Sequence, residues 1–273
     1  MADDLLTLLP EAERAARRRA RTVRAGAILA CQVGILVFLL GFWEWATVGN
    51  RELAFLFGSP SAVWTFIVRG WLDGTLLRDT YVTGAETVIG FLLGNAMGTL
   101  LGLSLWYSQF VARVVQPYVI AIGAIPIIAL APIIIIWFGT GLASKVVMAT
   151  LSVVVIALLT SYKGASSVDP DEMNLFRTLG ASKFQMFRRL VIPSALSDIF
   201  SGLRLTVGFA LIGAIIGEFM SSSEGLGHAI FQAGSLYNIP KVFAGLVATI
   251  ALALVLTWVV GKLERLLTPW KTD

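Results

Sequence analysis

The chain has 273 residues, of which 57% are hydrophobic and only 14% are charged, and its mean hydropathy is +0.82. Because soluble domains carry roughly a quarter charged residues, this composition excludes a soluble protein and predicts a chain that crosses a membrane several times. The net charge of +4 is concentrated outside the apolar segments, where basic residues set topology more often than they bind nucleic acid. A single cysteine excludes an intrachain disulfide, and with a single histidine it argues against a metal centre.

The first 25 residues are polar and basic, and the first apolar run begins near Gly26. By the positive-inside rule, arginines ahead of that run place this end of the chain in the cytoplasm. Binding to anionic lipid is the alternative role for these side chains. We expect no cleavable signal peptide in a stretch of this charge. The arginines are Arg14, Arg17, Arg18, Arg19, Arg21 and Arg24.

Six apolar segments are long enough to cross a bilayer as helices. The first ends in Trp43 and Trp45, which suit a membrane interface, and Glu44 between them is expected at headgroup depth. A capped amphipathic helix is predicted over residues 59–74, on the outer face. The sequence therefore predicts an all-α polytopic membrane protein with six transmembrane helices and both termini in the cytoplasm. The predicted spans cover about residues 27–47, 81–106, 110–138, 146–162, 195–220 and 242–266.

Four glycines recur every four residues in the second span, which places them in one stripe along a helix and favours close packing of a neighbour. These helix-packing residues are Gly90, Gly94, Gly98 and Gly102. Glu86 lies in the same span near its outer end, where snorkelling to the interface and a functional role are both compatible with the sequence.

The third span contains Pro117, Pro126 and Pro132. Proline removes a backbone hydrogen bond and bends a helix, and bent helices in membranes tend to line a pathway. We therefore predict that residues 125–139 line the translocation pathway, with a kinked packing helix as the alternative. Arg204 is expected either to face the pathway or to contact cytoplasmic lipid. The predicted pathway residues are Pro126, Ile127, Leu130, Pro132, Met148, Arg204, Phe209 and Glu218.

A polar, basic insert covers residues 169–193, between two apolar spans. Asp169 is a predicted N-cap with Pro170 at the first helical position and Glu172 completing a start of the capping-box type. Gly180 fits just past the end of this helix, where a left-handed residue is usual. A second short amphipathic helix is expected to follow, ending before Pro193. Counting spans from a cytoplasmic N-terminus places the insert in the cytoplasm.

The insert resembles the cytoplasmic signature of the permease subunits of bacterial ABC importers. That signature reads roughly Glu-Ala-Ala, three residues, Gly, nine residues, Ile, one residue, Leu-Pro. Gly180, Leu190, Ile192 and Pro193 match its later positions, whereas residues 174–176 (Asn-Leu-Phe) depart from Glu-Ala-Ala and lack the acidic residue. The stretches SPSAVW, IPIIALAPIIIIWFG and GEFMSSSEGLG are similar to the nitrate, sulfonate, taurine and bicarbonate branch of these permeases.

The resemblance implies a non-catalytic permease in the bacterial inner membrane, working as a homodimer. Its implied partners are two cytoplasmic ATPase subunits that bind ATP and Mg²⁺, an extracytoplasmic solute-binding protein, and membrane lipid. The chain itself has no GxxxxGK[ST] loop for nucleotide phosphates, and no cofactor is expected in it. The implied substrate is a small anion such as nitrate, a sulfonate or taurine. Thiamine-precursor pyrimidines, flavins and aromatic carboxylates are alternatives, and a stand-alone secondary transporter or channel is a further one.

The insert is then the expected docking element for the ATPase, since an amphipathic helix can place its apolar face in a groove of a partner. The expected docking residues are Asn174, Phe176, Arg177, Leu179, Gly180, Ala181, Phe184, Phe187, Arg188 and Pro193. Four regions follow from this interpretation. They are a basic cytoplasmic segment (1–25), a first span with an outer amphipathic segment (26–80), a permease core with coupling helices at 169–190 (81–267), and a cytoplasmic tail (268–273).

Overall fold

The computed structural model describes residues 11–267, and it describes side chains for residues 23, 24 and 26–266. All regular structure in the described range is helical, which confirms the predicted fold class. The arginines at positions 14–21 and the predicted tail at 268–273 lie outside the residues whose side chains are described. The chain divides into two compact units, residues 1–64 and residues 65–273.

The first unit holds α2 (Glu11–Thr47), α3 (Arg51–Phe57) and the start of α4 (Pro60–Leu72). Asn50 caps α3 by accepting from the amides of Glu52 and Leu53, both at 3.1 Å. The carboxylate of Glu44 accepts from the amide of Ser61 at 3.0 Å and from its hydroxyl at 2.7 Å. Glu44 therefore joins the end of α2 to the first turn of α4, and the helix predicted over 59–74 is present.

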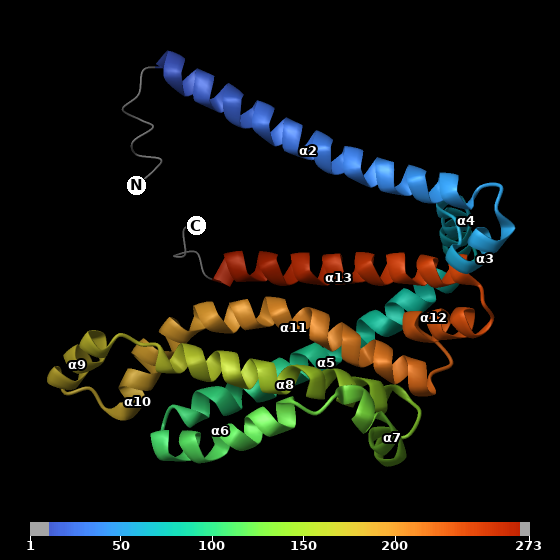
Figure 1. Cartoon of the computed structure of the whole chain (residues 1–273). Helices are drawn as coiled ribbons and strands as arrows, with labels where there is room; N and C mark the ends of the chain where they lie inside the picture. Colours follow the sequence, from blue (N-terminus) through green and yellow to red (C-terminus); the bar gives the residue numbers. More distant parts are fainter. Residues whose placement is uncertain (1–10, 268–273) are drawn as a thin grey trace. The chain divides into compact units, whose positions relative to one another are not determined.

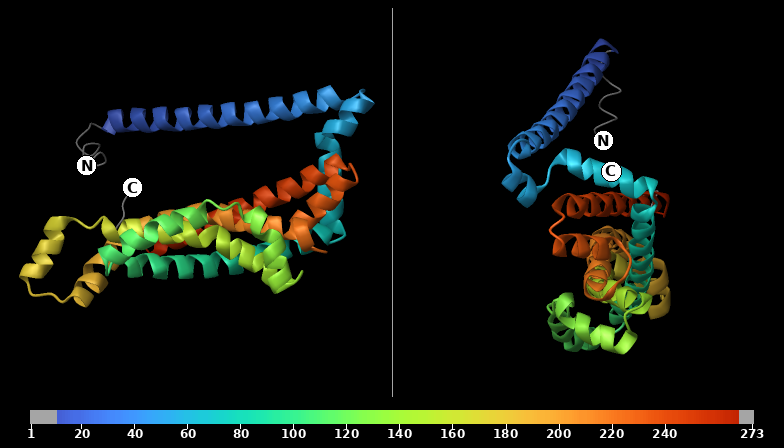
Figure 2. Two further views of the ribbon diagram at one scale, coloured as in Figure 1. Left: turned by 60° about the horizontal axis from the view of Figure 1, so that its bottom comes forward. Right: turned by 90° about the vertical axis from the view of Figure 1, so that its right-hand side faces the viewer.

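Four long helices run through the second unit: α5 (Thr75–Leu105), α8 (Leu142–Ser166), α11 (Ile192–Ser221) and α13 (Ile239–Leu267) (Figure 1). The connections between them are also helical. They comprise α6 (Gln109–Gly123), α7 (Ile127–Phe138), α9 (Pro170–Thr178), α10 (Lys183–Met186) and α12 (Leu226–Ser235). The views in Figure 2 place α9 and α10 at one end of this bundle and α7 and α12 at the other. We call these the α9 end and the α12 end.

Within residues 11–267, five helices are long and apolar enough to cross a membrane, and the number of spans rises to at most seven if each of two bent helix pairs forms one span. One of these pairs, α6 and α7, replaces the span predicted over 110–138, and its two helices meet at 89°. The break falls at residues 124–126, whereas Pro117 and Pro132 remain inside helices. Ile125 precedes a proline, a position where the helical conformation is disfavoured. The segment is therefore two helices, and as a pair they can form either one broken span or a re-entrant loop.

The second short helix predicted in the insert is also not separate. Residues 183–221 form one continuous 39-residue rod, in which five residues of π-helix, η1 (Phe187–Val191), join α10 to α11. A proline cannot donate to the carbonyl four residues earlier and its ring collides with that carbonyl. The wider turn before Pro193 accommodates this, because the amide of Ile192 bonds instead to Phe187 O. The helix α8 extends beyond the span predicted over 146–162 at both ends.

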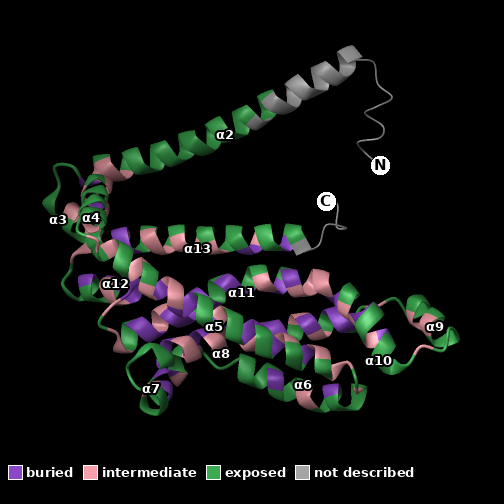
Figure 3. Cartoon of the chain, turned by 180° about the vertical axis from the view of Figure 1, so that it is seen from behind, coloured by how far each residue is buried: buried purple, intermediate pink, exposed green. Residues whose placement is uncertain are grey.

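The buried residues of the second unit are concentrated on α5, α8 and α11 (Figure 3). The glycine stripe of α5 faces α8. A Cβ added at Gly90 would lie 2.3 Å from Ala149 Cβ, and one at Gly98 would lie 2.4 Å from Val154 O. A Cβ added at Gly94 or Gly102 would likewise lie 2.8 or 2.3 Å from a backbone oxygen of α8. The two helix backbones approach more closely than any side chain at these positions would allow.

Candidate coupling segment and translocation core

Residues 169–182, which we call the coupling loop, begin with the predicted helix cap. The Asp169 carboxylate accepts from the amide of Asp171 at 2.9 Å, at the start of α9. Acidic residues occupy the first turn and Arg177 the last, an order that complements the helix dipole. Arg177 also donates to the Asn174 side chain at 3.3 Å. The loop therefore carries its own stabilising contacts at both ends of α9.

Gly180 ends this helix in a left-handed conformation, with φ of +71°. The next residues start the long rod with a capping box that the sequence analysis did not identify. The Ser182 hydroxyl accepts from the Gln185 amide at 3.3 Å, while the Gln185 side chain accepts from the Ser182 amide at 2.7 Å. A Ser-x-x-Gln pattern at 182–185 was the available sequence signal.

The start of the rod is attached to the turn between α5 and α6. Phe187 packs against Trp106 and Tyr107, with ring centroids 5.5 and 4.8 Å apart. The Lys183 ammonium donates to Tyr107 O at 2.6 Å and lies over both rings. Met173 of α9 packs on the same cluster. Phe187, expected at the partner interface, thus serves as an anchor inside the bundle.

Three large apolar side chains of the segment are left exposed. Leu175 is 57% exposed, Leu179 is 74% exposed and Phe184 is 63% exposed. Leu175 was one of the positions departing from the signature, and it was not among the expected docking residues. Of those that were, Phe176 and Ala181 are half-buried, whereas Arg188 and Pro193 are exposed. The coupling loop and α10 therefore present exposed apolar side chains, while Met173, Lys183 and Phe187 attach the same stretch to the bundle.

A buried polar cluster lies at the α12 end, around Glu218 of α11. Its carboxylate accepts from the Thr83 hydroxyl of α5 at 2.6 Å and from the Gly227 amide of α12 at 2.6 Å. The same Thr83 hydroxyl accepts from the Leu226 amide at 2.8 Å. Glu218 and Thr83 are 1% and 0% exposed, so three helices meet at one buried carboxylate.

Two further charged side chains complete this polar cluster. Glu86 of α5 is buried within hydrogen-bonding reach of Glu218, which places it in the interior rather than at the interface. Lys145 of α8 is buried and donates to Thr140 O and to Ser221 O. The sequence analysis missed Lys145 because the predicted span began one residue later. A lone lysine next to a long apolar run was the only signal.

The remaining predicted pathway residues fall in different places. Met148 is fully buried against Ala131 and Ile134, and Ile127 and Leu130 pack on this cluster. Arg204 forms an ion pair with Glu264 of α13, with Nε and Oε2 2.6 Å apart. The structure does not bring Arg204 together with the Met148 cluster or with Glu218. Ile127 and Leu130 are partly exposed, and Pro126, Pro132, Arg204 and Phe209 are exposed.

Residues 90–269 match the family model described as "Binding-protein-dependent transport system inner membrane component". The chain belongs to this family. It is a multi-pass inner-membrane permease of an ABC importer and part of a complex with ATPase subunits. Members of this family are the inner-membrane components of the transporter, so the chain is a non-catalytic permease component.

Among relatives of this permease, the formylaminopyrimidine transport permease ThiX of Halalkalibacterium halodurans is 37% identical over 67% of this chain and 73% of its own length. The riboflavin transport permease RibX of Chloroflexus aurantiacus is 32% identical, covering 87% of this chain and 89% of its own. The taurine permease TauC of Escherichia coli is 26% identical, covering 87% and 88%. Permeases for sulfonates and taurine are thus among its homologues.

The fold is also that of a solved importer. The inward-facing MetNI methionine ABC transporter matches with a TM-score of 0.63 at 21% identity, over 70% of this chain and 95% of the matched chain. At this level of identity the match concerns the fold alone.

Proposed function

We propose that this permease forms the translocation pathway of an ATP-driven importer and receives force from its ATPase subunits through the coupling loop and α10. The assembly is a homodimer of permeases with two cytoplasmic ATP- and Mg²⁺-binding subunits and an extracytoplasmic solute-binding protein. Both termini and the coupling loop lie on the cytoplasmic side, as the basic residues indicate.

The observation that carries this proposal is the continuous rod from Lys183 to Ser221. Its first turn lies beside the exposed apolar side chains of the coupling loop, and its last turn bears Glu218. A displacement at the docking surface would therefore reach the buried polar cluster at the α12 end through one rigid element. Rigid helices that join two sites are the means by which coupling spans such distances.

Docking is tested by replacing Leu175, Leu179 and Phe184 together by aspartate in the assembled complex. We expect the ATPase subunits to be lost on purification, because the charges would have to be buried in the partner's groove. Leu236→Asp is the matched control, since Leu236 is 72% exposed but lies at the α12 end. Retention of the ATPase by the triple variant, with normal ATP-dependent uptake, would refute the docking role.

We further infer that the substrate is a neutral nitrogen heterocycle of the pyrimidine or flavin kind. The identities to the pyrimidine and riboflavin permeases, 37% and 32%, exceed the 26% identity to the taurine permease. A pathway for anions needs cations or helix N-termini that face it. Two described cations of the bundle helices are already engaged: Lys145, in the polar cluster at the α12 end, by backbone carbonyls, and Arg204 of α11 by Glu264.

Uptake into proteoliposomes that contain the full complex and its binding protein distinguishes the substrate classes. Labelled formylaminopyrimidine, riboflavin, taurine and nitrate are compared with and without ATP inside the vesicles. We expect ATP-dependent uptake of a heterocycle. Uptake of taurine or nitrate instead would favour the anion predicted from the sequence, and uptake without ATPase subunits would favour a secondary transporter.

A further inference from the structure

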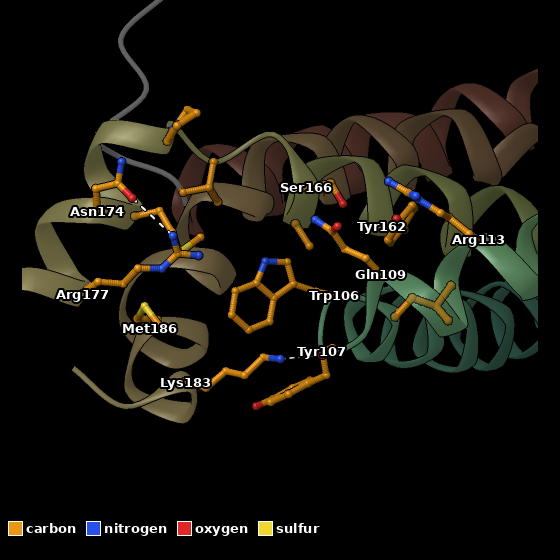
Figure 4. Close-up of a pocket in the computed structure, with 15 residues that line it drawn as sticks. Trp106, Tyr107, Gln109, Arg113, Tyr162, Ser166, Asn174, Arg177, Lys183 and Met186 are labelled. Atoms are coloured by element: carbon orange, nitrogen blue, oxygen red, sulfur yellow. Dashed lines mark hydrogen bonds between the residues drawn. The ribbon is translucent and has the colours of Figure 1, made fainter. Parts of the chain in front are cut away.

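A cavity of about 680 Å³ lies at the α9 end, between the α5–α6 turn, the end of α8 and the coupling loop. Figure 4 shows Trp106 in its middle, with Lys183 and Arg177 on one side and Gln109, Tyr162 and Arg113 on the other. Its volume is in the range of small-molecule sites. None of the residues assigned above to the pathway lines it.

The charge of this cavity has one sign. Arg113, Arg177 and Lys183 contribute cationic groups from three different helices, and no carboxylate is among the lining residues. Tyr162, Gln109 and Ser166 add polar side chains. Guanidinium and ammonium groups are the side-chain groups that bind phosphate in proteins. The cavity therefore has the chemistry of a site for a phosphate-bearing group.

An apolar groove of about 390 Å³ begins where this cavity ends. Leu105 lines both spaces, and the groove continues between α5, α6 and α8 along Leu101, Val119, Val155 and Leu158. Ser104 is the one polar side chain lining the groove, and its hydroxyl already donates to Leu101 O at 2.7 Å. The groove is thus suited to a hydrocarbon chain, and two of the helices that line it, α5 and α8, are long and apolar enough to cross a membrane.

We infer that the cavity and the groove together bind one anionic phospholipid of the cytoplasmic leaflet, with its phosphate in the cationic cavity and an acyl chain in the groove. A soluble anion would fill only the cavity, and a neutral hydrocarbon only the groove. The continuity at Leu105 is what joins the two chemistries in one ligand. The inference rests on the proposed function in one respect, namely that the coupling loop lies on the cytoplasmic side.

Such a lipid would bridge the parts that move during coupling. Its headgroup would contact α9 through Arg177 and the start of the rod through Lys183, while its chain would lie against α5, α6 and α8. Lys183 also holds Tyr107 O, so the same ammonium would serve both contacts. Anionic lipid would therefore stabilise the attachment of the coupling loop to the bundle.

Native mass spectrometry of the whole permease–ATPase complex tests this, with phosphatidylglycerol and phosphatidylcholine offered in equal amounts. We expect preferential retention of phosphatidylglycerol. Arg113→Gln should reduce that retention about fivefold, because each cation near an anionic surface contributes about 1 kcal/mol. Lys262→Gln is the control, since it removes one positive charge in the same way but Lys262 lines neither space.

A second variant separates a lipid from a free anion. Val155→Trp fills the groove without touching a cation, so it should reduce phosphatidylglycerol retention and leave sn-glycerol 3-phosphate binding unchanged. Equal retention of both lipids, equal loss in the control, or no effect of Val155→Trp would each overturn the inference. Recovery of the ATPase in every sample shows whether a negative result concerns the lipid alone or the coupling segment as well.

Discussion

The Thr83 hydroxyl donates to the Glu218 carboxylate at 2.6 Å, across 135 residues of sequence. The same oxygen accepts from the Leu226 amide, so one side chain of α5 holds the end of α11 and the start of α12 together. The loop between these helices is held by two more contacts, from the Gly225 amide to Asp79 at 3.0 Å and between Arg78 and Glu224. The loop between α11 and α12 is thus fixed to α5.

Thr83→Val preserves the shape of this contact and removes both hydrogen bonds. We expect a loss of about 1–3 kcal/mol in the free energy of unfolding for each buried group left unpaired, seen as a lower Tm of the complex. Thr87→Val is the control, because Thr87 is equally buried but only donates to Thr83 O in its own helix. Equal losses for the two variants would contradict a special role for the Thr83–Glu218 contact.

Gly98→Ala should disrupt the packing of α5 on α8. The added Cβ would lie 2.4 Å from Val154 O and 2.7 Å from Ala157 Cβ, and neither atom can move far. We expect a loss of roughly 1–3 kcal/mol, as for other overpacked cores. At Gly208 of α11 nothing lies within 4 Å, so Gly208→Ala should be neutral or stabilising. Thermal unfolding in nanodiscs compares the two, and a harmless Gly98→Ala would argue against a tight seam.

Phe187 and Phe184 should behave differently although both were expected to dock the ATPase. Phe187→Ala removes the contact with Trp106 and Tyr107, so it should lower the Tm of the permease itself. Phe184→Ala removes an exposed side chain and should leave that Tm unchanged while weakening ATPase binding. Unfolding and ATPase affinity measured on both variants decide the point. The reverse pattern would place Phe187, not Phe184, at the interface.

Substitution of Gly180 tests its backbone conformation alone, because a larger side chain there would cause no clash. An added Cβ would meet nothing within 4 Å, so any effect of substitution comes from the left-handed backbone. Gly180→Val should cost about 1–2 kcal/mol locally and impair ATP-dependent uptake, whereas Gly180→Asn should be milder because asparagine tolerates this conformation. If valine and asparagine had the same effect on uptake, the conformation of this residue would not be what matters.

Arg204→Gln distinguishes an ion pair from a pathway residue. The change removes the ion pair with the Glu264 side chain, which is 9% exposed, so folding yield should fall. Adding Glu264→Gln should then restore part of the yield, because both charges of the pair are then removed. Substrate selectivity in vesicles should be the same for both variants. Altered selectivity with Arg204→Gln alone would return Arg204 to the translocation pathway.

Several features of this permease can be predicted from local chemistry. Hydropathy and length specify the helical membrane class, Asp169 and Gly180 specify where α9 begins and ends, and the four-residue glycine period specifies a seam. Each of these follows from contacts within one helix or from the cost of placing polar groups in lipid. The family signature, from Gly180 to Pro193, is likewise contained in one short stretch.

Which distant groups meet depends on how the helices pack. Lys145 and Thr83 join Glu218 because α5, α8 and α11 pack side by side, and no local pattern fixes the rotation of one helix against another. Phe187 became an anchor because the α5–α6 turn brings Trp106 beneath it. The break before Pro126, among three prolines of equal local character, was selected by packing of α7 on α8. Burial and partner choice are properties of the assembled bundle.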